Sequence, residues 1–434
     1  MDPQTLGIVA FCCVIILIFI GVPIGAGLLL VGSIGLLVLE GLQYAQTQLL
    51  LNFMDQGTKF VFVAIPLYVL MGQLVFRTGL ASDLYGCVYR WVGRLPGGLA
   101  IASVIAAAGF GAVSGGSATA VATLGPMCMP EMRRFKYNGG LAAGCIASAG
   151  TLGILIPPSI FLISYGIWTE TSIGALFLAG IVPGLLMTLA YSCAILIICI
   201  IRPEMGPAGE RFTWREKFAW LAKVLPVFCI FLIITVGIYG GIFDPTEAGA
   251  FGLAGVLFFS LVMRRLKFRL LLECMQSTLA TSMMIFVILF GGHLISRFLV
   301  LTDLTSSLVI WISGLELSAW ELIAALTLMY IVLGMLLDIW AMLLLTIPFV
   351  VPAAVATGLD PIWFGIYIIV MCELAAITPP VGLNVYIMAR AAPEVPVGRI
   401  FLGVTPFFLA SLGLVVVLMA FPNLVLWLPN MAAR

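Results

Sequence analysis

Charged side chains are scarce in this sequence. Asp, Glu, Lys and Arg make up 9% of its 434 residues, and hydrophobic residues make up 63%. Soluble domains carry about 25% charged residues. So few charges could not cover the surface of a soluble protein of this length, so lipid must be the solvent for most of the exterior. We therefore expect an all-α polytopic membrane protein.

Other absences exclude whole classes of function. The net charge is +1, with no basic tail or stripe for nucleic acid, and no GxxxxGK[ST] loop for ATP occurs. The ten cysteines lie scattered in apolar runs without a CxxC pair, as small hydrophobic residues of helices do. The single histidine, His293, has no neighbouring metal ligand, and no Ser–Lys pair occurs. We therefore expect no enzyme activity, no cofactor and no transition metal.

Long apolar stretches run through the whole chain. A spanning helix takes about 20 apolar residues, and the N-terminus lacks the basic region of a signal peptide, so its first stretch is expected to be retained. Ten stretches are predicted to span the membrane: 5–21, 23–40, 50–76, 139–168, 173–201, 223–240, 244–263, 279–299, 361–390 and 399–420.

Two further apolar stretches are interrupted in the middle. Residues 97–132 are broken at Ser114-Gly115-Gly116-Ser117, and residues 318–357 are broken near Gly334 and Asp338. Each is predicted to form a re-entrant helical hairpin. Amphipathic segments at 80–93, 212–223 and 303–313 are expected to lie in the membrane interface, although a flexible loop suits 303–313 almost equally well.

Basic residues indicate the orientation, because Lys and Arg collect in cytoplasmic loops. Five basic clusters follow the third span, the first hairpin, and the fifth, seventh and ninth spans. All five fall on one side of the membrane if both interrupted stretches are hairpins. The model then has ten spans, two hairpins and both termini outside.

The sequence also repeats itself. A shift of 222 residues carries Pro23 onto Pro245, Pro126 onto Pro348, and Pro157-Pro158 onto Pro379-Pro380. We therefore expect a first repeat over 1–201, an interfacial cytoplasmic linker over 202–222 and a second repeat over 223–434, with opposite topologies. Inverted repeats are typical of secondary transporters, with the binding site between the halves near the bilayer midplane. A structural duplication without transport is the alternative.

Each repeat holds two places where the chain must leave the helix at membrane depth. One is the hairpin tip, and the other is a Pro-Pro pair that breaks a later span, at Pro157-Pro158 and at Pro379-Pro380. Irregular backbone is tolerated at that depth where it is buried in protein or lines a wet cavity. Broken helices offer free carbonyls, which suit Na⁺, and free N–H groups, which suit an anion.

These breaks predict two Na⁺ sites and one site for an organic anion. The residues fall into three sets. Sodium site 1 is assigned to Ser114, Ser117, Thr151 and Gly153; sodium site 2 to Asp338, Glu373 and Thr378; and the substrate site to Ser117, Ser159 and Asn384. Structural roles compete with these assignments, because the two tip serines and Asp338 could simply cap helices. Asp360 and Glu247 are expected to mark helix starts.

Several motifs resemble the large membrane subunit of DctP-type tripartite ATP-independent periplasmic (TRAP) transporters. They occur in order along nearly the whole chain: GFGAVSGGSATAVATLGPMCMPEM at 109–132, SAGTLGILIPPSIFLISYG at 148–166, DPTEAGAFG at 244–252, GMLLDIWAM at 334–342 and ELAAITPPVGLNVYIMA at 373–389. The first tip departs from the family's usual Ser-Gly-Ser by the extra Gly116. It is therefore open which serine matches the family's sodium-site position.

The resemblance implies a Na⁺-driven elevator in the bacterial inner membrane. It implies two protein partners, a small four-helix membrane (Q) subunit, expected here as a separate chain, and a soluble periplasmic substrate-binding (P) protein. It also implies a small organic acid as substrate, such as a C4-dicarboxylate or a sugar acid. The alternatives are a dicarboxylate/sodium symporter that needs no binding protein, and a channel.

Overall fold

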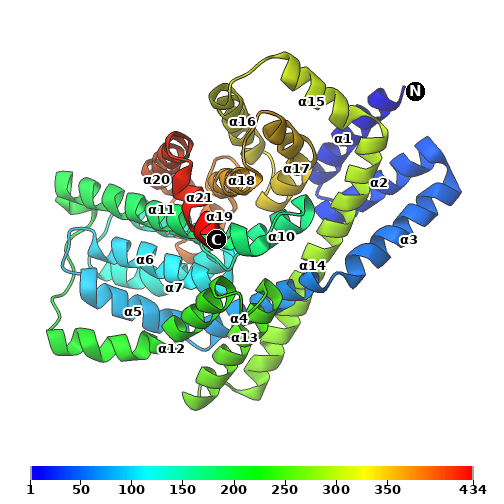
Figure 1. Cartoon of the computed structure of the whole chain (residues 1–434). Coiled ribbons are helices and arrows are strands. Elements are labelled where there is room, and N and C mark those ends of the chain that lie inside the picture. The colour runs from blue at the N-terminus through cyan, green and yellow to red at the C-terminus, as the bar shows by residue number, and fades with distance from the viewer. Residues whose placement is uncertain (1, 433–434) are drawn as a thin grey trace.

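The computed structural model describes residues 2–432, apart from the side chains of residues 112–114 and 313, and these residues are almost entirely helical (Figure 1). The first half contains α1 (Pro3–Phe19), α2 (Ile24–Glu40), α3 (Leu42–Thr58), η1 (Phe60–Val63), α4 (Ala64–Arg77), α5 (Leu80–Val92), α6 (Gly98–Ser114), α7 (Ser117–Arg134), α8 (Gly139–Ala149), α9 (Leu152–Leu155), α10 (Ile160–Thr169) and α11 (Ile173–Ile201).

The second half follows a short connection. It contains η2 (Pro203–Met205), α12 (Trp214–Tyr239), α13 (Pro245–Val262), α14 (Phe268–Leu301), α15 (Leu304–Gly314), α16 (Ala319–Gly334), α17 (Ile339–Ala356), α18 (Pro361–Ala375), α19 (Leu383–Ala391), α20 (Val397–Ala420) and α21 (Asn423–Ala432). Paired helices α6–α7 and α16–α17 occupy the stretches predicted to be hairpins. A broken helix and then a long helix follow each pair.

Helix starts are set by short polar side chains. Asp244 accepts hydrogen bonds from the N–H groups of Thr246 and Glu247, and the Glu247 carboxylate accepts one from the Asp244 N–H, which makes a capping box. Asp360 caps α18, where Pro361 is the first residue. The predicted structural roles of Glu247 and Asp360 are therefore confirmed.

The described residues contain seven helices long and apolar enough to cross a membrane, or eight if the bent pair α8–α9 and α10 counts as one span. This is fewer than the ten spans expected. Helices α1, α2 and α18 are apolar but shorter, with 17, 17 and 15 residues. Helix α1 stops at the turn before Pro23, where Gly21 has a positive φ of 92°, and α2 stops at Gly41, which has a positive φ of 85°. The polytopic architecture stands.

Three expected boundaries differ from the structure. The predicted span 50–76 is two helices, α3 and α4, joined through Lys59 and the short η1. The amphipathic segment 212–223 is not a separate connector, because it continues into α12 from Trp214. The span expected at 279–299 begins earlier, at Phe268. By contrast, 303–313 is helical as α15, so the loop alternative is wrong.

Glycines bring helices of the two halves into close contact. Helix α2 packs along the long α14, which crosses Figure 1 diagonally. A Cβ on Gly25 would lie 2.8 Å from the Ile288 nitrogen, and one on Gly32 would lie 3.0 Å from the Ile295 nitrogen. Small residues at helix crossings let backbones approach in this way, as is common in membranes.

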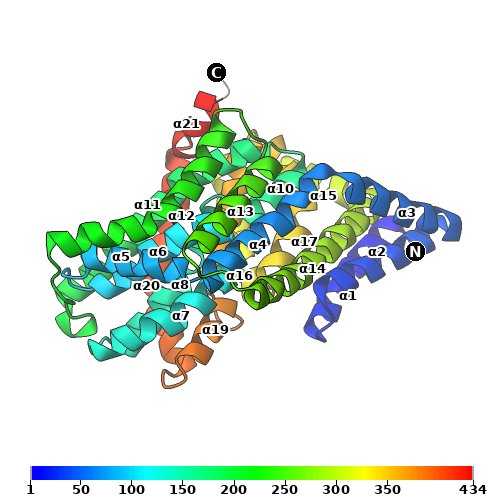
Figure 2. The same ribbon diagram turned by 90° about the horizontal axis from the view of Figure 1, so that it is seen from below.

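The two halves also meet elsewhere. Helix α13 packs on α4, α20 packs on α8, and α19 lies beside α7 (Figure 2). The α8–α20 crossing is especially close, because a Cβ on Gly403 would lie 1.9 Å from the Gly140 carbonyl oxygen. Neither half is therefore packed as an independent unit.

Candidate solute and ion site

The tip between α6 and α7 rests on the first Pro-Pro break. Gly115 turns the chain with φ of 62°, and a Cβ there would lie 3.0 Å from the Pro158 carbonyl oxygen. One turn earlier, a Cβ on Gly111 would lie 2.5 Å from the Gly153 Cα. The structure thus shows the predicted contact between the first tip and the first break, and the glycines at 111 and 115 permit this close approach.

Two side-chain hydroxyl groups at the first break form hydrogen bonds with the backbone of the break itself. Helix α8 ends at Ala149, and the Thr151 hydroxyl donates to the Ser148 carbonyl at 2.7 Å. Beyond the prolines, the Ser159 hydroxyl donates to the Ile154 carbonyl at 2.5 Å and accepts from the Leu162 N–H that begins α10. The helix segments on the two sides differ in direction by 42°. Both hydroxyls are buried and keep lone pairs for a further ligand.

The second tip and break are arranged in the same order. Asp338 caps α17 by accepting from the Ala341 N–H at 2.8 Å. The last residue of α16, Gly334, packs on Ala375 at the end of α18, where a Cβ would lie 2.8 Å from the Ala375 Cβ. The Thr378 hydroxyl donates to the Leu374 carbonyl at 2.6 Å. The second tip therefore also lies against its own break.

A hydrogen bond joins the second break to the first tip. The Asn384 amide, fully buried in α19, donates to the Ser117 hydroxyl at 2.6 Å and to the Ala147 carbonyl at 3.1 Å. Ser117 does not cap α7, so the capping alternative fails for this serine. We call this contact the Asn384 bridge.

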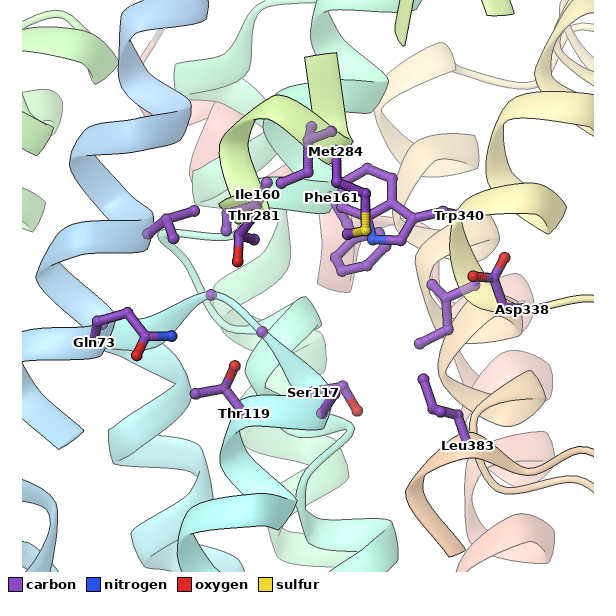
Figure 3. Close-up of a pocket in the computed structure, with 17 residues that line it drawn as sticks. Gln73, Ser117, Thr119, Ile160, Phe161, Thr281, Met284, Asp338, Trp340 and Leu383 are labelled. Carbon is purple, nitrogen blue, oxygen red and sulfur yellow. The ribbon is translucent and has the colours of Figure 1, made fainter. Parts of the chain in front are cut away.

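A cavity of about 260 Å³ lies between the tips and the helices α4 and α14 (Figure 3). Its polar side chains come from both sides and include Gln73 on α4 and Thr281 on α14, which point toward the space between the tips (Figure 3). Phe161 and Trp340 stack on each other at 4.2 Å between ring centroids. Among the described lining residues Asp338 is charged, and none is Lys or Arg.

The structure separates the predicted site residues into two groups. Ser117 and Asp338 line the cavity. The others are buried and do not line it: Thr151, Gly153, Ser159, Glu373, Thr378 and Asn384. The Ser114 side chain lies outside the described part of the structure. The assignment of these residues to sodium or substrate remains a prediction.

The residues predicted for sodium site 2 make separate polar contacts. No hydrogen bond or ion pair joins Asp338, Glu373 and Thr378 in the described part of the chain, and each polar contact of Asp338 and Thr378 is local. Both carboxylate oxygens of Glu373 are buried, and neither has a hydrogen-bond partner in the parts of the chain that the structure describes. A buried carboxyl group without a partner is costly inside a membrane, so it marks a candidate functional group.

Sequence reasoning missed the wall that α4 and α14 contribute. Gln73 was the one usable signal, because it is a polar residue inside an apolar stretch. Thr281 and Met284 on α14 carry no motif that separates them from ordinary helix residues. Phe161 and Trp340 lie within the quoted motifs at 148–166 and 334–342, but nothing in those motifs marks them as residues that line a cavity.

Comparison with known proteins decides the family. The family model for the tripartite ATP-independent periplasmic transporter, DctM component, matches residues 11–424. The chain belongs to this family. Its relatives are permease subunits and not enzymes.

Two relatives match this DctM-family chain over most of its length. It is 35% identical over 387 residues to the C4-dicarboxylate TRAP transporter large permease protein of Pseudomonas aeruginosa, covering 88% of this chain and 89% of that protein. It is 30% identical to the sialic acid TRAP transporter large permease protein of Vibrio cholerae, covering 96% of each. The DctM-family chain is therefore a large TRAP permease subunit and a multi-pass protein of the inner membrane.

A third relative and a solved structure extend the comparison. The ectoine/5-hydroxyectoine TRAP transporter large permease protein of Ruegeria pomeroyi is 30% identical, over 97% of this chain and 98% of that protein. The crystal structure of the Alcanivorax borkumensis YdaH transporter superposes with a TM-score of 0.63 and 18% identity, over 98% of this chain and 100% of that chain. At this identity the likeness concerns the fold of the DctM-family chain.

Proposed function

We propose that this permease subunit imports a small organic acid by Na⁺-coupled symport. The observation that carries the proposal is the cavity of about 260 Å³, which is bounded by two irregular tips on one side and by α4 and α14 on the other. Its size suits a compact solute, since pockets for drug-sized ligands range from about 300 to 1,000 Å³.

The tips and breaks supply the groups that a solute and Na⁺ need. Helices α8 and α18 end at the breaks and offer backbone carbonyl groups there. Helices α7, α10 and α17 begin at or beside the cavity and offer backbone N–H groups. Without a lysine or arginine in the described lining, a carboxylate group would depend on helix N-termini and on the hydroxyls of Ser117, Thr119 and Thr281. Na⁺ would take carbonyl and hydroxyl oxygens, with Asp338 or Glu373 supplying a negative charge.

The two walls of the cavity also support an elevator motion, in a chain built from two inverted repeats. One wall consists of the two tips and their breaks, which are held together by the Asn384 bridge. The opposite wall consists of α4 and α14, which belong to the group of helices packed with α2 and α13. We propose that the tips and breaks slide as one unit against this second group.

Three relatives have C4-dicarboxylate, sialic acid or ectoine in their names. We therefore expect the substrate to be an organic acid. The membership in the TRAP family supports two partners for transport, a small membrane subunit and a periplasmic substrate-binding protein.

Uptake into proteoliposomes tests the proposal. We expect that the chain, reconstituted with its small subunit and supplied with the cognate binding protein and solute, accumulates the solute when an inward Na⁺ gradient is present. The control replaces the Na⁺ gradient by a K⁺ gradient of equal size. Uptake that persists without Na⁺ would refute the coupling, and uptake that persists without the binding protein would support an independent symporter.

A further inference from the structure

A groove on the outer surface of the helices lies apart from the cavity between the tips, with which it shares no lining residue. It lies between the C-terminal end of α11 and the first turns of α20, with α8 as its floor, and encloses about 540 Å³. The two walls are neighbouring helices in Figure 1. We call it the α11–α20 groove. Its apolar lining side chains are Leu141, Ile198, Ile201, Met205, Leu402 and Pro406.

The groove exists because glycines meet at its floor. Gly403 of α20 sits directly on the Gly140 carbonyl of α8, and a Cβ on Gly144 would lie 2.4 Å from the Gly403 carbonyl carbon. Since no side chain stands at this crossing, the space beside it is open. Ile201 and Leu402 are 72% and 74% exposed, so the groove opens toward the surroundings, which are lipid for a helix of this composition.

One end of the groove is strongly basic. Arg202 follows the last residue of α11, and Arg399 lies in the first turn of α20. Both are exposed. Neither has an acidic group within ion-pair distance among residues 2–432. Two arginines therefore stand beside an apolar groove with their charge uncompensated.

A second cavity of about 300 Å³ continues from this basic end. The two cavities share Asn138, Gly140 and Arg399. The second cavity adds Arg133, which pairs with Glu394. The Asn138 side-chain oxygen caps α8 at the Leu141 N–H, at 3.2 Å, which leaves its amide group as a donor. The charge of the combined lining is therefore positive.

We propose that the α11–α20 groove binds an anionic phospholipid, such as phosphatidylglycerol or cardiolipin, with its phosphate between Arg202 and Arg399 and an acyl chain along Ile201 and Leu402. Basic pockets between membrane helices on the cytoplasmic side bind anionic headgroups in this way. Arginine is well suited to a phosphate, because its planar guanidinium group donates two parallel hydrogen bonds.

Two features favour this ligand over related ones. A free phosphate ion would satisfy the arginines and leave the apolar groove unexplained. A zwitterionic lipid would bring an ammonium group, and the acidic residue of the described lining, Glu394, is already paired with Arg133. A bound lipid would contact α8, α11 and α20 together, and would stabilise the start of the broken helix α8.

The test compares nanodiscs of different lipid composition. The full chain is placed in phosphatidylcholine alone, or in phosphatidylcholine with phosphatidylglycerol, and its Tm and retained lipid are measured by thermal unfolding and native mass spectrometry. We expect phosphatidylglycerol to raise the Tm and to remain bound. The double variant Arg202→Gln/Arg399→Gln should bind it about 30-fold more weakly, since each arginine near anionic lipid contributes on the order of 1 kcal/mol.

Two controls separate this site from general charge effects. Arg211→Gln removes another exposed positive charge, which lies outside the groove, and this variant should keep the full Tm shift. Arg202→Lys/Arg399→Lys keeps both charges and should retain most of the binding. The proposal is overturned if the glutamine double variant keeps the shift, or if inorganic phosphate or phosphatidylethanolamine produces the same shift as phosphatidylglycerol.

Discussion

The Asn384 bridge makes a sharp prediction about how the two halves hold together. Replacing Asn384 by Ala removes both hydrogen bonds, to the Ser117 hydroxyl at 2.6 Å and to the Ala147 carbonyl at 3.1 Å. Asn384 is fully buried, so water cannot replace the lost partners. We expect the variant to insert into the membrane normally and to be less stable.

The size of the effect follows from the two bonds. Interhelical hydrogen bonds in membrane proteins average about 0.6 kcal/mol and reach about 1.7 kcal/mol. Two such bonds predict a loss of about 1–3 kcal/mol in the free energy of unfolding. Asn384→Asp should cost more, because it replaces the donor by a second acceptor that faces the Ala147 carbonyl.

Unfolding of the purified chain in mixed micelles with increasing SDS, followed by tryptophan fluorescence, measures this loss. Ser164→Ala is the matched control, because Ser164 is equally buried and donates within its own helix, to the Ile160 carbonyl at 2.8 Å. Its loss should be clearly smaller. If Asn384→Ala and Ser164→Ala unfold at the same SDS fraction, the bridge does not stabilise the fold and the reasoning is refuted.

Four further predictions concern packing, ions and topology. Gly32→Leu should destabilise the chain by about 1–3 kcal/mol in the same assay, because its Cβ would already lie 3.0 Å from the Ile295 nitrogen. Ser117→Ala or Asp338→Ala should raise the Na⁺ concentration needed for half-maximal uptake without reducing the amount of protein in the membrane. Glu373→Gln should also weaken the Na⁺ response while leaving stability unchanged or higher, since a buried carboxylate without a partner is costly. A cysteine at Thr357, in a background whose exposed native cysteines are serine, should react with an impermeant maleimide from outside.

Each of these has a result that would contradict it. Gly413→Leu is the control for packing, because nothing lies within 4 Å of a Cβ there, and equal losses at both glycines would show that the α2–α14 contact is not tight. A wild-type Na⁺ response in the three site variants would argue against the sodium assignments. Labelling at position 357 from the cytoplasmic side alone would overturn the orientation.

The helical architecture followed from the sequence because lipid imposes simple rules on it. Apolar runs located most helices, and Pro and Gly located the tips and breaks. The predicted helix boundaries are wrong where a helix contains both polar and apolar segments. Helix α3 is polar enough that residues 42–49 fell outside the predicted spans and the rest of it was joined to α4, although its backbone is helical from Leu42 to Thr58. The basic and aromatic start of α12 belongs to the same helix as the apolar span that follows.

The candidate site was predictable in part. Its irregular backbone carries motifs, so Ser117 and Asp338 could be selected, and both line the cavity. Ser117 and Asn384 were both placed in the substrate set, but the hydrogen bond between them joins residues far apart in the chain, and no local pattern encodes it. The opposite wall was missed because Gln73 and Thr281 lie on regular helices without a motif, and a polar residue inside an apolar stretch, such as Gln73, is a weak signal by itself.

The glycine contact between α2 and α14 has a consequence for biosynthesis. Helix α2 ends at Glu40, whereas its partner begins at Phe268. At roughly 5–20 residues per second, the ribosome needs on the order of 10–50 s to make the intervening chain. Throughout that interval the Gly25 and Gly32 face of α2 has no native partner and must be covered by lipid, another helix or a chaperone. The early helices of this permease thus enter the membrane well before the surface that they are shaped to meet.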